Sequence, residues 1–126
     1  YLELLGQTIT RVQRGSGRRR QSVAESSFDA WTKFYKQDVG SPNFIVSYYA
    51  KGSLIALALD LTIRRMTGDE YSLDDVVREC WKRYGETGEG MPERGLEAVA
   101  LDHVAFQPPV DGIGGHRLRH HLRHCL

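Results

Sequence analysis

A long apolar stretch from Ile45 to Thr67 limits what this chain can fold into. Its apolar residues do not form one stripe, and a helix that is apolar nearly all round is usually buried on most sides. Arg64 and Arg65 lie near its end, and Gly68 follows at a position where glycine commonly terminates a helix. We therefore predict that residues 45–67 form the buried central helix of a helical domain.

Charged residues argue against a membrane span in the same stretch. Lys51, Asp60 and Arg64 interrupt it, and the uncharged run 52–59 is much shorter than the roughly 20 residues that a spanning helix needs. No membrane partner is therefore expected. A carboxylate among apolar residues needs a partner, and Arg64 lies four residues after Asp60 on the same helix face. We expect these two side chains to form a structural ion pair.

Helical spacing recurs along the rest of the chain. Apolar residues three and four positions apart predict further helices over residues 1–13, 21–35, 72–85 and from Pro92 onward. No segment alternates with a period of two for long, so strands are not expected. We predict an all-α fold, a compact bundle of about five helices around the buried central helix, with an irregular C-terminal tail.

Two serines have the spacing of a capping box, in which each side chain hydrogen-bonds to the backbone N–H of the other residue. These pairs are Ser26 with Asp29 and Ser72 with Asp75, and each predicts a helix start. Trp81 lies in the middle of the apolar stripe of the second of these helices. We therefore expect Trp81 to pack against the central helix.

The end of the chain differs in composition from the rest. Prolines and glycines come first, and arginine and histidine dominate from His116 on. We predict a helical region over residues 1–103 and an irregular tail over 104–126. In a helix, His116, His120 and His124 would share one face and offer ligands to zinc, copper or nickel. We interpret them as adventitious metal ligands and expect no built metal site.

The charge balance limits the classes of partner. The 126 residues suffice for one domain with a core, and 17 lysines and arginines against 16 acids give a net charge of +1. This balance argues against a nucleic-acid partner. Arg18, Arg19 and Arg20 nevertheless form a basic cluster, so the alternative function is a non-enzymatic helical module that binds an acidic partner or nucleic acid. Cys80 lies on an apolar helix face and is expected to be a reduced thiol.

The sharpest motif is Tyr48-Tyr49-Ala50-Lys51-Gly52, at the start of the central helix. Adjacent residues of a helix point about 100° apart, so we expect that Tyr48 and Tyr49 do not face the same cleft. A phenol at this place either packs and caps the start of the helix or donates a hydrogen bond to a bound substrate. Residue types alone favour the packing role.

The Tyr-x-Lys-Gly core of this motif, residues 49–52, resembles the Tyr-Glu-Lys-Gly segment of zinc aminopeptidases in the thermolysin-like gluzincin clan. Neighbouring segments are similar in order and spacing to blocks of the PDZ-containing glycyl-aminopeptidase family, and they read QSVAESSFDAW, SPN, LALDLTIRR and SLDDVVRECWKRYG. The similarity extends from residue 1 to about residue 100. It implies that residues 1–103 are the helical C-terminal half of a metallopeptidase catalytic domain.

The resemblance implies that the parent enzyme is a zinc-dependent hydrolase that cleaves peptides with an N-terminal glycine. The family's His-Glu-x-x-His motif and Trp-x-x-Glu-Gly helix are absent from this sequence, so zinc is expected in the parent and no cofactor in this chain. The chain alone is therefore expected to be an inactive fragment. By resemblance Tyr49 is its catalytic residue, since a phenol can donate a hydrogen bond to the oxyanion of a tetrahedral intermediate.

Three acidic residues also invite a functional interpretation. Glu25 lies beside two serines, and Asp74 and Asp75 are adjacent. No histidine pair accompanies them, and the helix dipole favours acidic residues in a first turn. We interpret all three as helix-start residues and not as metal ligands or an acid–base pair.

The resemblance also implies partners. In the parent these are the rest of the catalytic domain, a PDZ module downstream and a peptide substrate. A helical unit separated from its other half exposes apolar surface that favours contacts, so we expect homo-oligomers. Residues 104–126 do not fit the family, and a shift of reading frame near residues 100–103 is our hypothesis for that change.

Overall fold

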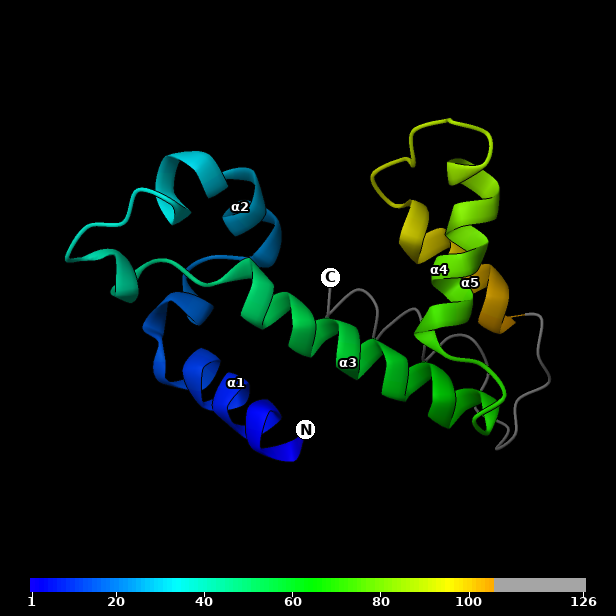
Figure 1. The fold of residues 1–126 in the computed structure, drawn as a ribbon, viewed down its shortest axis with the longest axis horizontal. Helices are drawn as coiled ribbons and strands as arrows, with labels where there is room; N and C mark the ends of the chain where they lie inside the picture. The colour runs from blue at the N-terminus through cyan, green and yellow to red at the C-terminus, as the bar shows by residue number, and fades with distance from the viewer. Residues whose placement is uncertain (106–126) are drawn as a thin grey trace. The chain divides into compact units, whose positions relative to one another are not determined.

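The computed structural model of the protein describes residues 1–105, except for the side chains of Pro42 and of residues 103–105 (Figure 1). This part of the chain contains helices and no strand, so the all-α prediction and the expected number of about five helices are confirmed. The helices are α1 (Leu2–Arg14), α2 (Val23–Phe28), α3 (Tyr48–Thr67), α4 (Leu73–Cys80) and α5 (Gly95–Ala105). Short 3₁₀ or π-helical turns are η1 (Ser16–Arg19), η2 (Ala30–Phe34), η3 (Ser41–Asn43) and η4 (Trp81–Gly85). Residues 104 and 105 of the predicted irregular tail belong to α5, and the rest of the tail with its histidines lies outside the described residues.

The chain divides into two compact units, Tyr1–Ala56 and the residues from Leu57 on, and the boundary lies within α3. A single bundle around the central helix is therefore not confirmed. The central helix also begins at Tyr48 and not at Ile45. In the described part of the chain it buries only Leu59, Ile63 and Thr67, and Leu61 is 56% exposed. The expectation of burial on most sides is wrong, because the buried residues recur every fourth position and form one stripe.

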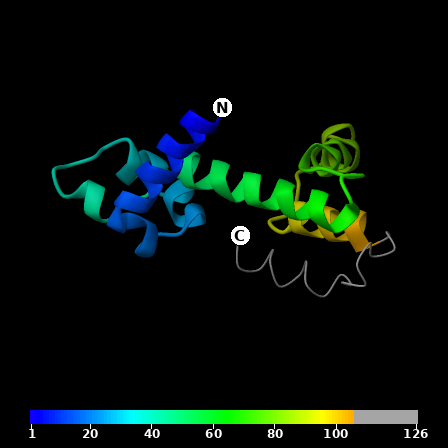
Figure 2. The ribbon, with the colours of Figure 1, turned by 90° about the horizontal axis from the view of Figure 1, so that it is seen from below.

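The core of the second unit combines residues from three helices. Ile63 of α3, Val76 of α4 and Val99 of α5 are fully inaccessible to solvent, and Ala100 and Leu59 join them. α4 and α5 lie side by side in both views (Figures 1 and 2). Each of the three helices thus buries its apolar stripe against the other two, which is what a helical core requires.

Trp81 does not belong to this core. Its side chain is 64% exposed, and a methyl group added at Gly85 would collide with its ring. The residues that do pack from this helix are Val76, Cys80 and Tyr84, and Cys80 is a free thiol as predicted. The prediction for Trp81 is wrong because the buried stripe follows Val76, Cys80 and Tyr84. Trp81 is one residue after Cys80 and points about 100° away from it, beside the stripe and toward solvent.

Hydrogen bonds at the helix ends confirm part of the local analysis. Gly68 adopts a φ of 61°, and the N–H of Asp69 donates to the carbonyl of Arg64 at 2.8 Å, so α3 ends where glycine predicts. The carboxylate of Asp75 accepts from the backbone N–H and the hydroxyl of Ser72 at 2.9 and 2.7 Å. The predicted capping box at the start of α4 is thus confirmed.

The other predicted capping box is wrong. The first turn of α2 is capped by Ser22 and Glu25, because the Glu25 carboxylate accepts from the Ser22 N–H at 2.8 Å and the Ser22 hydroxyl accepts from the Glu25 N–H at 3.1 Å. Ser26 is instead buried and donates to the carbonyl of Val46 at 2.5 Å. The Ser-x-x-acid spacing occurs twice within these few residues, and spacing alone does not distinguish the two.

Asp60 connects α3 to the start of α4 in the second unit. Its carboxylate accepts from Arg64 Nε at 2.9 Å, which confirms the predicted ion pair, and from the backbone N–H of Leu73 at 2.8 Å. Leu73 is in the first turn of α4, where N–H groups have no partner within the helix. The hydrogen bond from Leu73 and then the pairing with Arg64 hold the pKa of Asp60 below its usual value.

Replacing Asp60 with asparagine is expected to lower the free energy of unfolding at neutral pH by about 1–3 kcal/mol, the range for hydrogen bonds to a charged group. A carboxyl with a lowered folded-state pKa stabilises the protein above its unfolded-state pKa, and this contribution is lost as the pH falls through the folded-state pKa. The difference between wild type and Asp60→Asn should therefore disappear in acid. Urea unfolding at several pH values measures it.

Asp74→Asn is the matched control, because the Asp74 side chain is exposed in the first turn of α4, next to the Leu73 N–H that Asp60 binds. This variant should differ from wild type by no more than about 0.5 kcal/mol at any pH. A difference for Asp60→Asn that persisted unchanged into the acid range would show that the carboxylate charge does not matter.

Candidate functional site

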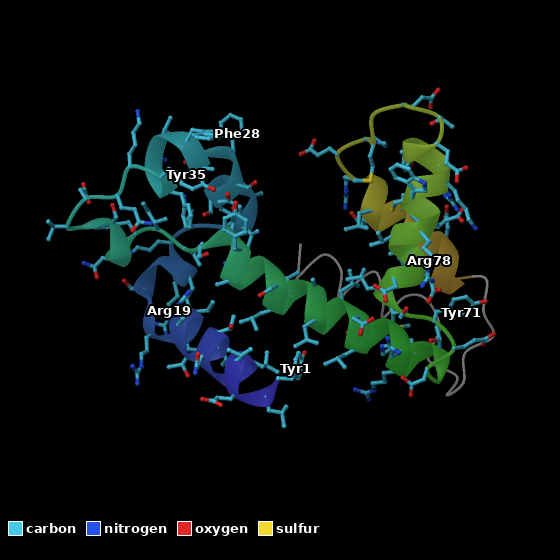
Figure 3. The ribbon with its side chains drawn as sticks, viewed as in Figure 1. Tyr1, Arg19, Phe28, Tyr35, Tyr71 and Arg78 are labelled. Atoms are coloured by element: carbon cyan, nitrogen blue, oxygen red, sulfur yellow. The ribbon has the colours of Figure 1, made fainter. Side chains whose placement is uncertain are left out.

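Three tyrosine hydroxyl groups meet on the first unit. The Tyr35 oxygen lies 3.1 Å from the Tyr48 oxygen and 3.0 Å from the Tyr49 oxygen. Tyr35 directly follows η2, and its hydroxyl group reaches the first two residues of α3 (Figure 3). Phe34 supports the group, since its ring centroid is 5.1 Å from that of Tyr48 and 6.2 Å from that of Tyr49. The arrangement is an aromatic cluster with its hydroxyl groups gathered at one point.

Tyr48 and Tyr49 do not diverge as predicted. Their ring centroids are 4.2 Å apart, and both hydroxyl groups reach the same oxygen of Tyr35. The 100° between adjacent residues of a helix fixes the directions of their Cα–Cβ bonds but not those of the whole side chains. Tyr48 is the first residue of α3 and has no preceding helical turn to restrict its χ1 angle, so the two long side chains can converge.

Backbone contacts fix the start of α3 beneath this cluster. The Ser47 hydroxyl accepts from the Ala50 N–H at 3.2 Å, as an N-cap does. Val46 is buried, its N–H donates to Gln21 Oε1 at 3.1 Å, and its carbonyl accepts from Ser26. The segment that leads into α3 is therefore held to α2 and to the residues before it.

The lysine of the Tyr-x-Lys-Gly motif forms hydrogen bonds with backbone carbonyl groups. Lys51 Nζ donates to the carbonyls of Arg18 and Gln21, each at 3.3 Å. The buried Gly17 lies directly against Ile45, and an added Cβ would lie 2.2 Å from the Ile45 carbonyl oxygen. These contacts hold the residues around the basic cluster against the segment that leads into α3.

The hydroxyl groups of the two adjacent tyrosines, Tyr48 and Tyr49, have pKa values that shift in opposite directions. The hydrogen bond with Tyr35 and then the adjacent Tyr49 hydroxyl raise the pKa of Tyr48 well above its usual value. The hydrogen bond with Tyr35 and then the adjacent Tyr48 hydroxyl lower the pKa of Tyr49. Tyr49 is also 61% exposed, so its hydroxyl can reach a bound molecule. Of the two, Tyr49 is the better donor to an oxygen that gains negative charge.

The other residues singled out in the sequence have local partners. Glu25 caps α2, and the Ser22 hydrogen bonds lower its pKa. Asp75 caps α4, so both interpretations as helix-start residues are confirmed. Arg18 Nε donates to the carbonyl of Gln13 at 3.2 Å, and the Arg20 guanidinium lies 4.9 Å from the centre of the Phe44 ring.

Neither a metal site nor a membrane span is found in the described residues. Within residues 1–102, whose side chains the structure describes apart from Pro42, no three histidine, cysteine, aspartate or glutamate side chains gather as metal ligands would. In the same range no helix combines the length and apolar character that crossing a bilayer demands.

The tyrosine cluster lies in the segment that matches a known family. Residues 1–55 match the model of the M61 glycyl aminopeptidase family. This segment is similar to a glycyl aminopeptidase. The match ends within α3 and covers less than half of the chain, and it supports the aminopeptidase resemblance of residues 49–52. Neither the curated proteins nor the solved structures contain a match to the chain.

Tyr35 is the residue of this site that the sequence analysis did not identify. Helical spacing alone groups Tyr35 with Phe28 and Trp31, and all three side chains are exposed. No local spacing relates Tyr35 to Tyr48 and Tyr49, because the 35–48 segment between them is irregular apart from η3. Only the fold brings these residues together.

Proposed function

We propose that this chain is the helical part of a zinc-dependent glycyl-aminopeptidase catalytic domain, and that Tyr49 donates a hydrogen bond to the oxyanion formed during peptide hydrolysis. The observation that carries the proposal is the exposed Tyr49 hydroxyl, held by Tyr35 within the segment similar to glycyl aminopeptidases. A donor on a fixed helix start needs no rearrangement when charge develops in the transition state.

The described residues do not fit the zinc of this family. Because no group of three ligand side chains occurs within residues 1–102, we place the zinc in the remaining part of the proposed parent enzyme. We place the PDZ module and the membership of the gluzincin clan in that parent as well. The isolated chain is then inactive, and its role is to supply Tyr49.

The rest of the catalytic domain is the partner that this proposal requires. α1 buries none of its residues in the structure, and Leu2 and Leu4 are more than half exposed. An amphipathic helix normally covers its apolar face with another element. We propose that the remaining part of the parent covers α1, and that without it the chain associates with its own copies.

The basic cluster gives less support to the alternative of an acidic or nucleic-acid partner. Arg18 donates to a backbone carbonyl and Arg20 lies over Phe44, so two of its three members take part in local packing. Binding of nucleic acid with a steep dependence on salt would favour that alternative.

The proposed function is tested with the full-length protein that contains this chain and with the 126-residue chain alone. We expect the full-length protein to hydrolyse glycyl 4-nitroanilide faster than leucyl 4-nitroanilide, and the chain alone to hydrolyse neither. Absence of hydrolysis by a folded full-length protein, or a preference for leucine, would refute the proposal.

A further inference from the structure

The three tyrosine hydroxyl groups form a series with Tyr35 in the middle. Its oxygen is within hydrogen-bonding distance of both Tyr48 and Tyr49, at 3.1 and 3.0 Å. Each phenol has one proton to donate and lone pairs to accept. Two hydrogen bonds among three hydroxyl groups use two protons, so one proton is left to point out of the group.

The direction of the series decides which residue carries the outward proton. If Tyr48 donates to Tyr35 and Tyr35 donates to Tyr49, the remaining proton is on Tyr49. In the reverse direction it is on Tyr48, which is less exposed. A hydroxyl that accepts a hydrogen bond becomes a stronger donor, because bonds in a series polarise one another.

We propose that Tyr35 is a positioning residue that accepts from Tyr48 and donates to Tyr49, so that the Tyr49 proton points to the substrate oxygen. The distances place Tyr35 in the middle of the series, and the greater exposure of Tyr49 favours the direction that leaves the outward proton there. The role of Tyr35 in hydrolysis rests on the proposed function. Tyr35 itself does not touch the substrate.

The environment of the cluster agrees with this direction. Ionisation of Tyr48 would break the hydrogen bond that it donates to Tyr35, which agrees with its raised pKa. Ionisation of Tyr49 would strengthen the hydrogen bond that it accepts from Tyr35, which agrees with its lowered pKa. Among the described residues, the titratable groups that act on Tyr49 are the phenols of Tyr35 and Tyr48.

The direction is tested on the 126-residue chain by NMR titration of ¹³C-labelled tyrosine Cζ atoms. In the wild type, we expect Tyr49 to titrate at a lower pH than Tyr48. In Tyr35→Phe, the two midpoints should move toward each other, because both lose the hydrogen bond that separates them. Tyr1→Phe is the control and should leave both midpoints unchanged, since Tyr1 is exposed at the N-cap position of α1 and has no contact with the cluster among the ring pairs and hydrogen bonds of the described residues. Midpoints that stay apart in Tyr35→Phe would overturn the proposal.

The role in hydrolysis is tested separately in the full-length protein. Tyr35→Phe should lower kcat roughly 10-fold with little change in KM, because the donor remains but loses its orientation. If the midpoints converge in the chain while Tyr35→Phe keeps full kcat and Tyr49→Phe lowers it, the positioning role is refuted and the proposed function stands. If Tyr49→Phe also keeps full activity, the proposed function of Tyr49 fails while the direction of the series stands.

Discussion

Replacing Tyr49 with phenylalanine in the full-length protein is expected to lower kcat about 10²–10³-fold, the usual effect of removing one donor to an oxyanion. KM should change much less, because the hydrogen bond forms mainly in the transition state. The phenylalanine ring keeps its contacts with Phe34 and Tyr48, so the free energy of unfolding should stay nearly unchanged. Steady-state kinetics with glycyl 4-nitroanilide and thermal unfolding measure the two effects.

Tyr48→Phe is the matched control for this prediction. Tyr48 has the same ring, lies next in the chain and contacts the same Tyr35 oxygen, but its proton points into the cluster. Its kcat should stay within about 3-fold of wild type, since the Tyr49 donor remains oriented by Tyr35. If the two variants exchange their effects, Tyr48 is the donor. If both are silent, Tyr49 only packs against the helix start.

Replacing Gly17 with alanine is expected to destabilise the first unit by roughly 3 kcal/mol, the upper end of the usual cost of overpacking. The added Cβ would lie 2.2, 2.6 and 2.9 Å from the O, C and N atoms of Ile45. These are backbone atoms, so no side-chain rotation relieves the collision, and η1 must move away from the segment that enters α3. Thermal unfolding of the chain should show a clear decrease in Tm.

Gly6→Ala is the control, because it makes the same substitution in the same unit. Gly6 lies within α1, and an added Cβ there would have no atom within 4 Å. Alanine is favoured over glycine in a helix by about 0.5–1 kcal/mol, so this variant should be slightly more stable than wild type. Equal losses in the two variants would mean that the contact with Ile45 is not the cause.

Features that depend on residues within one turn could be predicted from the sequence. The end of α3 at Gly68, the box of Ser72 with Asp75 and the ion pair of Asp60 with Arg64 each involve residues at most four positions apart. Their geometry follows from the helix itself, whatever the rest of the chain does.

Features that depend on residues far apart in the sequence could not be predicted from it. The second hydrogen bond of Asp60 reaches Leu73, 13 positions away, and Ser26 reaches Val46, 20 positions away. Periodicity places Trp81 and Val76 alike on an apolar stripe, but only Val76 is buried. A pattern of apolar residues does not say which of two overlapping stripes another helix will cover. The motif therefore led to Tyr49, while Tyr35 became visible only in the folded chain.

The contacts of Lys51 show that the residues of the Tyr-x-Lys-Gly motif do not share one role. Lys51 binds the backbone carbonyls of Arg18 and Gln21, whereas only Tyr49 of the motif contacts the hydroxyl cluster. An added Cβ at Gly52 would meet Val23 at an ordinary 3.9 Å, so space does not require glycine there. A homologue without a catalytic tyrosine would therefore still need the lysine for folding. Under the proposed function, the tyrosine pair with Tyr35 is the more informative signature in a search for active enzymes.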